Sequence, residues 1–225
     1  FDLTMPEEIN RMVTDSITDY FFTTSEIANK NLRKAGVEAK RIFYVGNTMI
    51  DTLLKQMPNF IRPAVFDEQN LKPQDYFVMT MHRPANVDEA EKLQEFLNTI
   101  ESNVNGCPVL FPVHPRTANI LKEMGLKFNG IHQTPPMSYL EFNYLVQHAK
   151  CVITDSGGIT EETTVMGVPC MTLRDNTERP ETITQGTNEL IGTNPEKLIP
   201  ALKTLFDGDW KKGTIPHLWD GRTAD

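Results

Sequence analysis

Short apolar runs alternate with helical patterns along most of the chain. From residue 75 onward, six apolar runs predict strands, at residues 76–82, 108–114, around 131, 151–154, 168–173 and 188–192. Helical patterns separate them, at residues 88–104, 117–124, 138–149, 158–166, near Glu181 and at 196–206. Strands that alternate with helices, with no hairpin patterns between them, form parallel sheets. This part of the chain therefore predicts an α/β fold with a doubly wound parallel sheet.

The first 57 residues show the same alternation in a shorter form. Strands are predicted at residues 20–24 and 41–47, and helices at 4–20, 25–36 and 48–57. In the first helix, Thr4 and Glu7 match a capping box. Its apolar face is formed by Ile9, Met12, Val13, Ile17 and Tyr20. Glu7 and Arg11 are four residues apart, so as structure they are interpreted as a surface ion pair on one face.

A charged, irregular stretch with three prolines separates the two parts. It covers residues 58–73, and we interpret it as an interdomain linker. The predicted division is therefore residues 1–57, the linker 58–73, and a second domain at 74–225.

The stretch TDSGGITEE, residues 154–162, joins an apolar run to two glycines and a helical pattern. This predicts a strand, a tight turn and a helix N-terminus, with Asp155 or Ser156 as the cap. Gly157 and Gly158 allow a ligand to approach the main chain, and the unpaired amides at the helix start suit a phosphate or diphosphate.

Glu162 follows on the helix face near this turn, where a carboxylate accepts hydrogen bonds from a ribose. A nucleotide diphosphate is the ligand that fits both features. An ordinary capped βα turn explains the same residues, because the GxGxxG spacing of a dinucleotide site is missing. Both interpretations stay open on local grounds.

Cationic and hydrogen-bonding residues follow several of the predicted strands. They are His82 and Arg83 after the first, His114 and Arg116 after the second, residues 155–158 after the fourth, and residues 174–179 after the fifth. A single histidine at a strand end is usually a packing residue, but several such ends share one edge of a parallel sheet. Their combination favours a cleft for an anion such as a sugar nucleotide. No ligand spacing supports a metal site at His82 and His114.

The composition of the chain argues against some classes of binding partner. A net charge of −8, from 22 basic and 30 acidic residues, argues against a nucleic-acid or anionic-membrane surface. The three cysteines lack CxxC spacing and are interpreted as reduced packing residues. No signal peptide or long apolar span is recognised, so we expect a soluble, cytoplasmic protein.

The sequence resembles the UDP-N-acetylglucosamine 2-epimerases of the non-hydrolysing type over nearly its whole length. The motifs that carry the resemblance are MPEEINR, FYVGNTMIDTLL, MTMHRPANVD, FPVHPRT, TPPMSYLEF, VITDSGGITEE, GVPCMTLRDNTERPET and GTNELIGTNP. Their order and spacing together are highly specific.

The resemblance implies a glycosyltransferase-B fold, in which two Rossmann-like domains face a cleft. Residues 1–57 correspond to the tail of the N-terminal domain, and 74–225 to the C-terminal nucleotide-binding domain. The chain begins without Met and ends in GRTAD, so we expect an N-terminally truncated fragment. Because the family's other catalytic carboxylates lie upstream of Phe1, this fragment is expected to bind UDP weakly and not to epimerise.

The implied activity is reversible conversion of UDP-GlcNAc to UDP-ManNAc, by elimination of UDP to a 2-acetamidoglucal and its re-addition. It needs no cofactor and no metal, belongs to polysaccharide biosynthesis, and implies a homodimer for the full-length protein. Carried over by motif, the catalytic residues are Glu7, Arg11 and His82. The residues that match UDP and sugar binding are Arg83, His114, Ser156, Gly157, Gly158, Glu162 and Arg179.

One departure affects regulation and substrate. Many bacterial members read HRREN where this chain has HRPAN, residues 82–86, a region that also holds an allosteric UDP-GlcNAc in those enzymes. Pro84 and Ala85 put that regulation in doubt and allow a modified substrate, such as a UDP-2,3-diacetamido sugar uronate. A hydrolysing epimerase, a glycosyltransferase of the same fold and a non-catalytic sugar-nucleotide sensor remain as alternatives.

Overall fold

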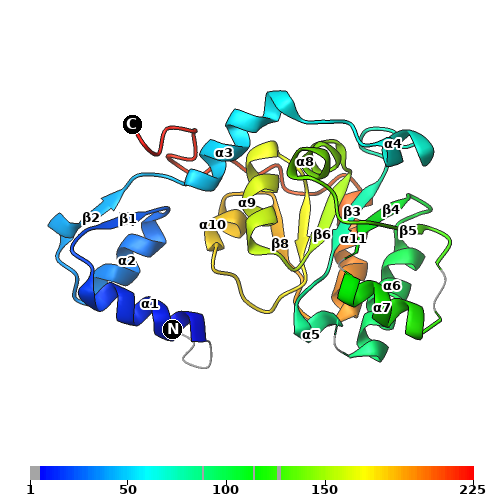
Figure 1. The fold of residues 1–225 in the computed structure, drawn as a ribbon, viewed down its shortest axis with the longest axis horizontal. Coiled ribbons are helices and arrows are strands. Elements are labelled where there is room, and N and C mark those ends of the chain that lie inside the picture. Colours follow the sequence, from blue (N-terminus) through cyan, green and yellow to red (C-terminus); the bar gives the residue numbers. More distant parts are fainter. Residues whose placement is uncertain (1–5, 88, 114, 126–127) are drawn as a thin grey trace. The chain divides into compact units, whose positions relative to one another are not determined.

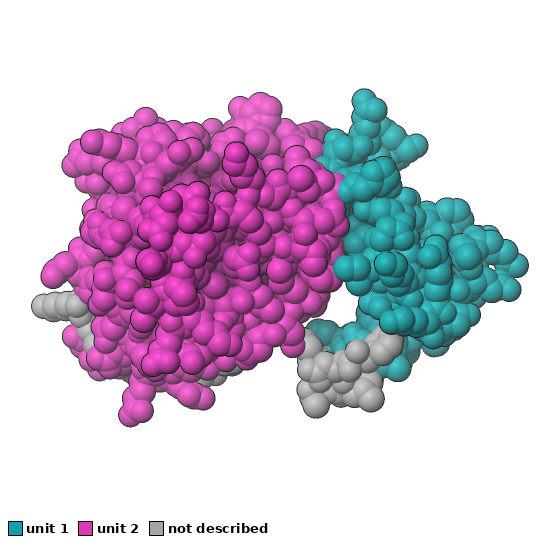
Figure 2. Space-filling view, turned by 180° about the vertical axis from the view of Figure 1, so that it is seen from behind, with its two compact units in different colours: residues 1–51, 217–225 teal, residues 52–216 magenta. Residues whose placement is uncertain are grey.

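The structure is a computed structural model that describes residues 6–87, 89–113, 115–125 and 128–225. The chain divides into two compact units, which Figure 2 shows in different colours. Unit 1 comprises Phe1–Asp51 and His217–Asp225, and unit 2 comprises Thr52–Pro216. Each unit is described by itself.

Unit 1 is built on two short parallel strands. Its elements are α1 (Pro6–Ile17), β1 (Phe21–Thr23), α2 (Glu26–Lys34), η1 (Ala39–Arg41), β2 (Ile42–Tyr44) and the start of α3 (Thr48–Gln56). Phe21 pairs with Ile42 in register. The hydroxyl of Ser25 caps α2 by accepting a hydrogen bond from the amide of Ala28 at 3.2 Å.

Helix α1 is amphipathic, but it buries none of its residues. The predicted apolar residues are all exposed, from 44% for Met12 to 81% for Ile17. Thr4, half of the predicted capping box, lies outside the described residues. The guanidinium of Arg11 bonds Glu8 at 2.7 Å and also bonds Asp15, whereas the sequence suggested Glu7 as its partner.

Unit 2 holds a six-stranded sheet in which every neighbouring pair is parallel, in the order β5-β4-β3-β6-β7-β8. The strands are β3 (Phe77–Thr80), β4 (Val109–Pro112), β5 (Ile131–Thr134), β6 (Cys151–Thr154), β7 (Cys170–Thr172) and β8 (Asn188–Leu190). The helices are η2 (Met57–Asn59), α4 (Ala64–Glu68), α5 (Pro84–Val87), α6 (Ala90–Asn103), α7 (Pro115–Glu123), α8 (Tyr139–His148), α9 (Gly157–Met166), α10 (Pro180–Thr184), η3 (Pro195–Lys197) and α11 (Leu198–Phe206). The predicted doubly wound parallel sheet is confirmed.

Side chains of the central strands alternate between two buried layers. Phe77 and Met79 of β3 belong to one hydrophobic cluster, with residues of α6 and α11. Val78 belongs to the other, with residues of α4 and α8. Successive strand residues point to opposite faces of the sheet. Each strand of a sheet that is covered on both faces therefore has a continuous apolar sequence. Figure 1 shows the sheet between these helices.

The predicted linker, residues 58–73, lies within unit 2. It contains η2 and α4, and Phe66 is only 2% exposed. The Phe66 ring packs edge to face on Tyr76, with centroids 5.7 Å apart. The predicted boundaries at 57 and 74 thus differ from the division into units, which falls at Asp51. The assignment of these parts to the two domains of a larger fold stays a prediction.

Candidate functional site

The two central strands of unit 2 mark the point where the sheet reverses its order. From β3 the chain proceeds outward to β4 and β5, and then returns to β6 on the other side of β3. The last residues of these strands, Thr80 and Thr154, join their hydroxyl groups at 2.6 Å. In open α/β sheets, ligands bind beyond the carboxyl ends of strands at such a reversal.

Asp155 follows β6 directly and holds the loops around this point together. Its Oδ2 accepts hydrogen bonds from the backbone amides of His82 at 2.9 Å and Arg83 at 2.8 Å, and from the side chain of Asn86 at 3.2 Å. Asn86 also donates to the carbonyl of Leu173 at 3.1 Å. The carboxylate is completely buried, so these bonds fix where the chain runs after β3 and after β7.

The imidazole of His82 pairs with the same carboxylate. Its Nδ1 lies 2.8 Å from Oδ1 of Asp155, and this interaction raises the pKa of His82 against the opposing effect of burial. Burial alone would raise the pKa of Asp155, but the bonds from His82 and from the two backbone amides outweigh it and lower that pKa. With Nδ1 engaged, Nε2 is the ring nitrogen left for a ligand.

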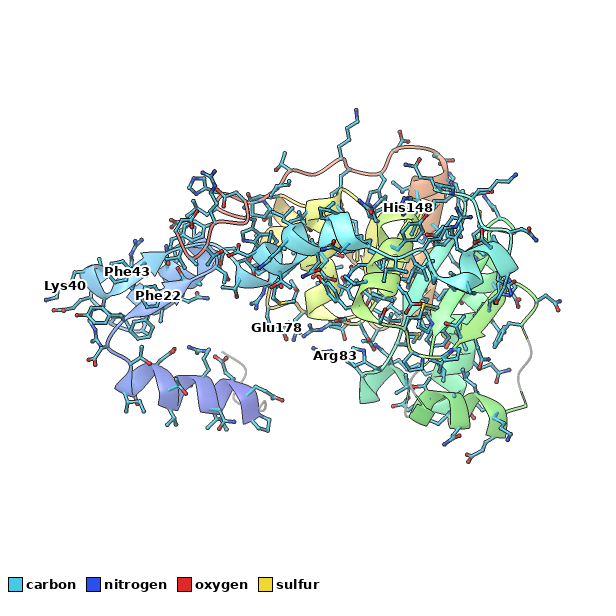
Figure 3. All side chains as sticks on the ribbon, turned by 45° about the horizontal axis from the view of Figure 1, so that its top comes forward. Phe22, Lys40, Phe43, Arg83, His148 and Glu178 are labelled. Atoms are coloured by element: carbon cyan, nitrogen blue, oxygen red, sulfur yellow. The ribbon has the colours of Figure 1, made fainter. Side chains whose placement is uncertain are left out.

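An arginine and a glutamate lie beside the glycine turn. The guanidinium of Arg174 donates two hydrogen bonds of 2.7 Å to the carboxylate of Glu178, from Nη1 to Oε2 and from Nη2 to Oε1. Arg83 approaches Glu178 from the β3 loop, with Nη2 3.8 Å from Oε1. A Cβ added to Gly157 would lie 3.4 Å from Oε2 of Glu178, so this carboxylate is next to the start of α9. Figure 3 labels Arg83 and Glu178.

Two carboxylates on α9 hold further side chains. Glu162 is 6% exposed, and its Oε1 accepts a 2.8 Å hydrogen bond from the hydroxyl of Tyr139. Burial raises the pKa of Glu162, and the bond from Tyr139 opposes that rise. Glu161 is 1% exposed and accepts a bond from Nε of Arg179. α9 thereby positions Arg179 as well as the glycine turn.

The structure thus brings most of the residues predicted in unit 2 to one edge of its sheet. They are His82, Arg83, Gly157, Gly158 and Arg179, with Glu162 further along α9. Ser156 is the N-cap residue of α9 by position, but its side chain makes no cap hydrogen bond. Asp155, the other predicted cap, bonds the β3 loop instead.

Four other predicted residues lie outside the described part of the chain or in the other unit. His114 lies outside the described residues, and so does the side chain of Arg116. Glu7 and Arg11 belong to α1 of unit 1, which is described separately from unit 2. Their predicted roles stay predictions.

Three residues of this group were not identified as site residues from the sequence. The individual role predicted for Asp155 was that of a cap, although it was also grouped with the polar residues that follow the predicted strands. Tyr139 carried no signal, because it reaches its partner through the fold. Glu178 and Arg174 stood in the stretch predicted to line the cleft, without a stated role.

Among residues 6–87, 89–113, 115–125 and 128–225, no group of three or more His, Cys, Asp or Glu side chains is placed to hold a metal ion. None of the described helices combines the length and the apolar character needed to cross a membrane. A groove of about 590 Å³ lies between α4 and the edge strand β5, and none of the predicted site residues that the structure describes lines it.

The family model and the sequence relatives of this chain all point to UDP-sugar 2-epimerases. The family model described as UDP-N-acetylglucosamine 2-epimerase matches residues 1–225. A UDP-N-acetylglucosamine 2-epimerase of Methanocaldococcus jannaschii is 42% identical over 229 residues, which cover 94% of this chain and 61% of that protein. A UDP-2,3-diacetamido-2,3-dideoxy-D-glucuronate 2-epimerase of Pseudomonas aeruginosa is 36% identical over 208 residues, covering 91% of this chain and 57% of that protein.

Solved structures agree with the sequence relatives. The crystal structure of the M. jannaschii UDP-GlcNAc 2-epimerase, in complex with UDP-GlcNAc and UDP, is similar with a TM-score of 0.81 and 40% identity. The match covers 98% of this chain and 64% of that one. The chain therefore spans less than two thirds of the length of the relatives that it matches.

Proposed function

The chain belongs to the UDP-N-acetylglucosamine 2-epimerase family, and on this premise we propose that unit 2 binds the UDP portion of a UDP-sugar during reversible epimerisation at C2. The observation that carries the proposal is the cluster at the reversal of the sheet. There a histidine, three arginines and the start of α9 lie together in a chain whose net charge is −8. Guanidinium donors and the amides at a helix start, gathered at one edge of the sheet, favour a small anionic ligand.

Two parts of UDP, the diphosphate and the ribose, have a matching feature. The diphosphate fits the turn at Gly157 and Gly158, where helix amides lack intrahelical partners, with Arg83 and Arg174 beside it. The carboxylate of Glu162 is the acceptor for ribose hydroxyl groups, and Tyr139 already donates to one of its oxygens. Arg179 is held by Glu161 near the same helix.

The proposed reaction uses His82 as a proton-transfer group. A base removes the proton from C2 while the C1–O bond breaks, so that UDP leaves with the bonding electrons and a C1–C2 double bond forms. A proton then returns to the other face of C2 as UDP adds back to C1. The carboxylate of Asp155 stabilises the protonated imidazole of His82. Glu7 and Arg11 are proposed as further catalytic residues from their motif alone.

Calorimetric titration with UDP tests the nucleotide site. We expect the chain to bind UDP and the Glu162→Ala variant to lose roughly 1–3 kcal/mol of binding free energy, as loss of hydrogen bonds to a buried group predicts. Glu95→Ala, on the exposed side of α6, is the matched control and should bind like the unaltered chain. Equal UDP affinities for the Glu162 and Glu95 variants would show that the ribose assignment is wrong.

A modified UDP-sugar is the second candidate substrate. The HRPAN motif favours it, and so does the 36% identity with the P. aeruginosa enzyme named for a diacetamido uronate. Comparing the affinities of UDP-GlcNAc and UDP-2,3-diacetamido-2,3-dideoxy-D-glucuronate separates the two. Tighter binding of the uronate would identify the modified sugar as the substrate, and tighter binding of UDP-GlcNAc would exclude this second candidate.

A further inference from the structure

The negative charge of Glu178 lies at the position where the phosphates of the proposed ligand would bind. Its carboxylate accepts both 2.7 Å bonds from Arg174, lies 3.8 Å from Arg83, and is next to Gly157 at the start of α9. These are the groups that would bind a diphosphate. The carboxylate therefore competes with a diphosphate for the same donors.

The two partners of the ion pair between Arg174 and Glu178 differ in their exposure to solvent. The side chain of Arg174 is 6% exposed, whereas that of Glu178 is 49% exposed. A buried guanidinium without an anion is costly, so Arg174 needs a negative partner whether or not a ligand is bound. The half-exposed carboxylate of Glu178 can return to water at a much smaller cost.

Glu178 also remains charged under ordinary conditions. The bonds from Arg174, more than any other influence, lower its pKa to about 2. A permanent charge at this position partly neutralises Arg174 and Arg83 and repels other anions. Weakly bound anions such as phosphate then gain little from entering the site.

We propose that Glu178 is an internal substitute for the diphosphate, which pairs with Arg174 and Arg83 in the empty site and is displaced when a nucleoside diphosphate binds. The inference rests on the proposed function, because it takes the glycine turn as the diphosphate site. A diphosphate carries more charge and more acceptor oxygens than a carboxylate. It can therefore take over both bonds of Arg174 and engage Arg83 and the α9 amides, which a single phosphate does less well.

The test compares UDP affinity in three forms of the full 225-residue chain. Glu178→Gln keeps the shape of the side chain and removes its charge. Glu95→Gln removes one negative charge from the exposed surface of α6 and is the matched control for net charge. We expect the Glu178→Gln variant to bind UDP roughly tenfold more tightly than the unaltered chain, a gain of about 1.4 kcal/mol. The control should bind UDP like the unaltered chain.

Two further ligands and one further variant test whether the effect depends on the phosphates of the ligand and on the charge of Glu178. Uridine lacks the phosphates, so the three forms should bind it equally. Inorganic phosphate should bind more tightly to Glu178→Gln than to the unaltered chain. Glu178→Asp retains the charge on a shorter side chain and should not show the full gain. Thermal unfolding of each variant without ligand checks that the affinities compare folded proteins.

The outcomes separate this inference from the proposed function. If the unaltered chain binds UDP and Glu178→Gln binds it equally or more weakly, Glu178 is a structural or ligand-binding residue and the displacement is wrong. If neither form binds UDP, both the displacement and the UDP site are wrong. Tighter UDP binding that appears equally in Glu95→Gln would reflect net charge and would also overturn the inference.

Discussion

A single buried carboxylate organises the centre of the proposed site. Asp155 accepts hydrogen bonds from the backbone at His82 and Arg83 and pairs with the His82 ring. Burying a carboxylate is unfavourable unless such bonds compensate, so its environment must be closely maintained. The same residue therefore sets both the position of the β3 loop and the protonation of the histidine.

Replacing Asp155 by Asn should lower the pKa of His82. The bond to Asp155 is the largest influence that raises this pKa, and an amide has no charge to stabilise the imidazolium. NMR titration of the histidine ring protons measures the shift, and His132 and His148, elsewhere in unit 2, serve as internal controls. A His82 pKa unchanged in the Asn variant would contradict the pairing.

The same substitution should change how stability depends on pH. The pKa of Asp155 is lowered in the folded chain, so its contribution is present above its unfolded value, about 3.9, and is lost as pH falls through the folded pKa. The pKa of His82 is raised, so its contribution is present below about 6.5 and is lost as pH rises through the folded pKa.

Urea unfolding of both forms at several pH values measures this effect. The unaltered chain should lose stability toward acid faster than Asp155→Asn, whose amide does not titrate. It should also lose more stability as pH rises through the folded pKa of His82. Parallel pH profiles for the two forms would contradict the linkage.

The sequence was informative about most site residues and not about their partners. His82, Arg83 and Gly157 each follow a strand, so the general rule for parallel sheets was enough to group them. The bonds to Asp155 depend on β3 and β6 being neighbours, although 70 residues separate Thr80 from Cys151 as β4 and β5 intervene. No local pattern encodes that adjacency, and Asp155 was therefore interpreted as a helix cap.

At the scale of elements, Gly157 at the start of α9 and Gly186 after α10 should respond differently to an added methyl group. A Cβ on Gly157 would meet nothing nearer than 3.4 Å, whereas on Gly186 it would lie 2.4 Å from the hydroxyl oxygen of Thr164 and 2.6 Å from the carbonyl of Thr182. Gly186→Ala should destabilise the chain by roughly 1–3 kcal/mol through overpacking. Gly157→Ala should leave the free energy of unfolding nearly unchanged.

For UDP binding we expect Gly157→Ala to have the large effect, although it barely changes stability. The methyl group of Gly157→Ala would lie where a diphosphate approaches the main chain, so UDP binding should weaken at least tenfold, about 1.4 kcal/mol. Chemical denaturation and calorimetric titration measure the two quantities. Unimpaired UDP binding by a stably folded Gly157→Ala variant would exclude close approach of the ligand at this turn.

Element prediction succeeded where burial on both faces produced a strong pattern. All six strands of unit 2 were predicted, because β3, β4, β6 and β7 are apolar almost throughout. α4 was missed because prolines suggested an irregular stretch, whereas Pro63 is the N-cap residue from which the helix begins. α5 has only four residues, too few for a helical period to show.

At the scale of the whole molecule, the last nine residues pack against the beginning of the chain. Residues 217–225 were predicted with the second domain, but they belong to unit 1. Trp219 is 1% exposed there and donates a 3.0 Å hydrogen bond to the carbonyl of Thr24. Thr223 bonds Asp51 through its hydroxyl at 2.8 Å. Sequence patterns do not reveal such a return, because it depends on contacts between distant residues.

The chain has two tryptophans, and the two units hold one each, which makes their stabilities separable. Among the described residues, the buried hydrophobic side chains of unit 1 are Phe21, Leu32, Ile50 and Trp219, far fewer than those of unit 2. A small core stabilises a fold weakly, because burial of apolar area is the main favourable term. Unit 1 should therefore unfold at a lower denaturant concentration than unit 2.

Fluorescence of single-tryptophan variants measures the two transitions independently. Trp210→Phe leaves Trp219 as the reporter of unit 1, and Trp219→Phe leaves Trp210, whose Nε1 donates to the carbonyl of Thr187 at 2.8 Å, as the reporter of unit 2. The Trp219 signal should change first in urea, and UDP should shift only the Trp210 transition, because a ligand stabilises the unit that binds it. Coincident transitions would mean that the two units unfold as one, and a shift of both by UDP would place ligand contacts in unit 1 as well.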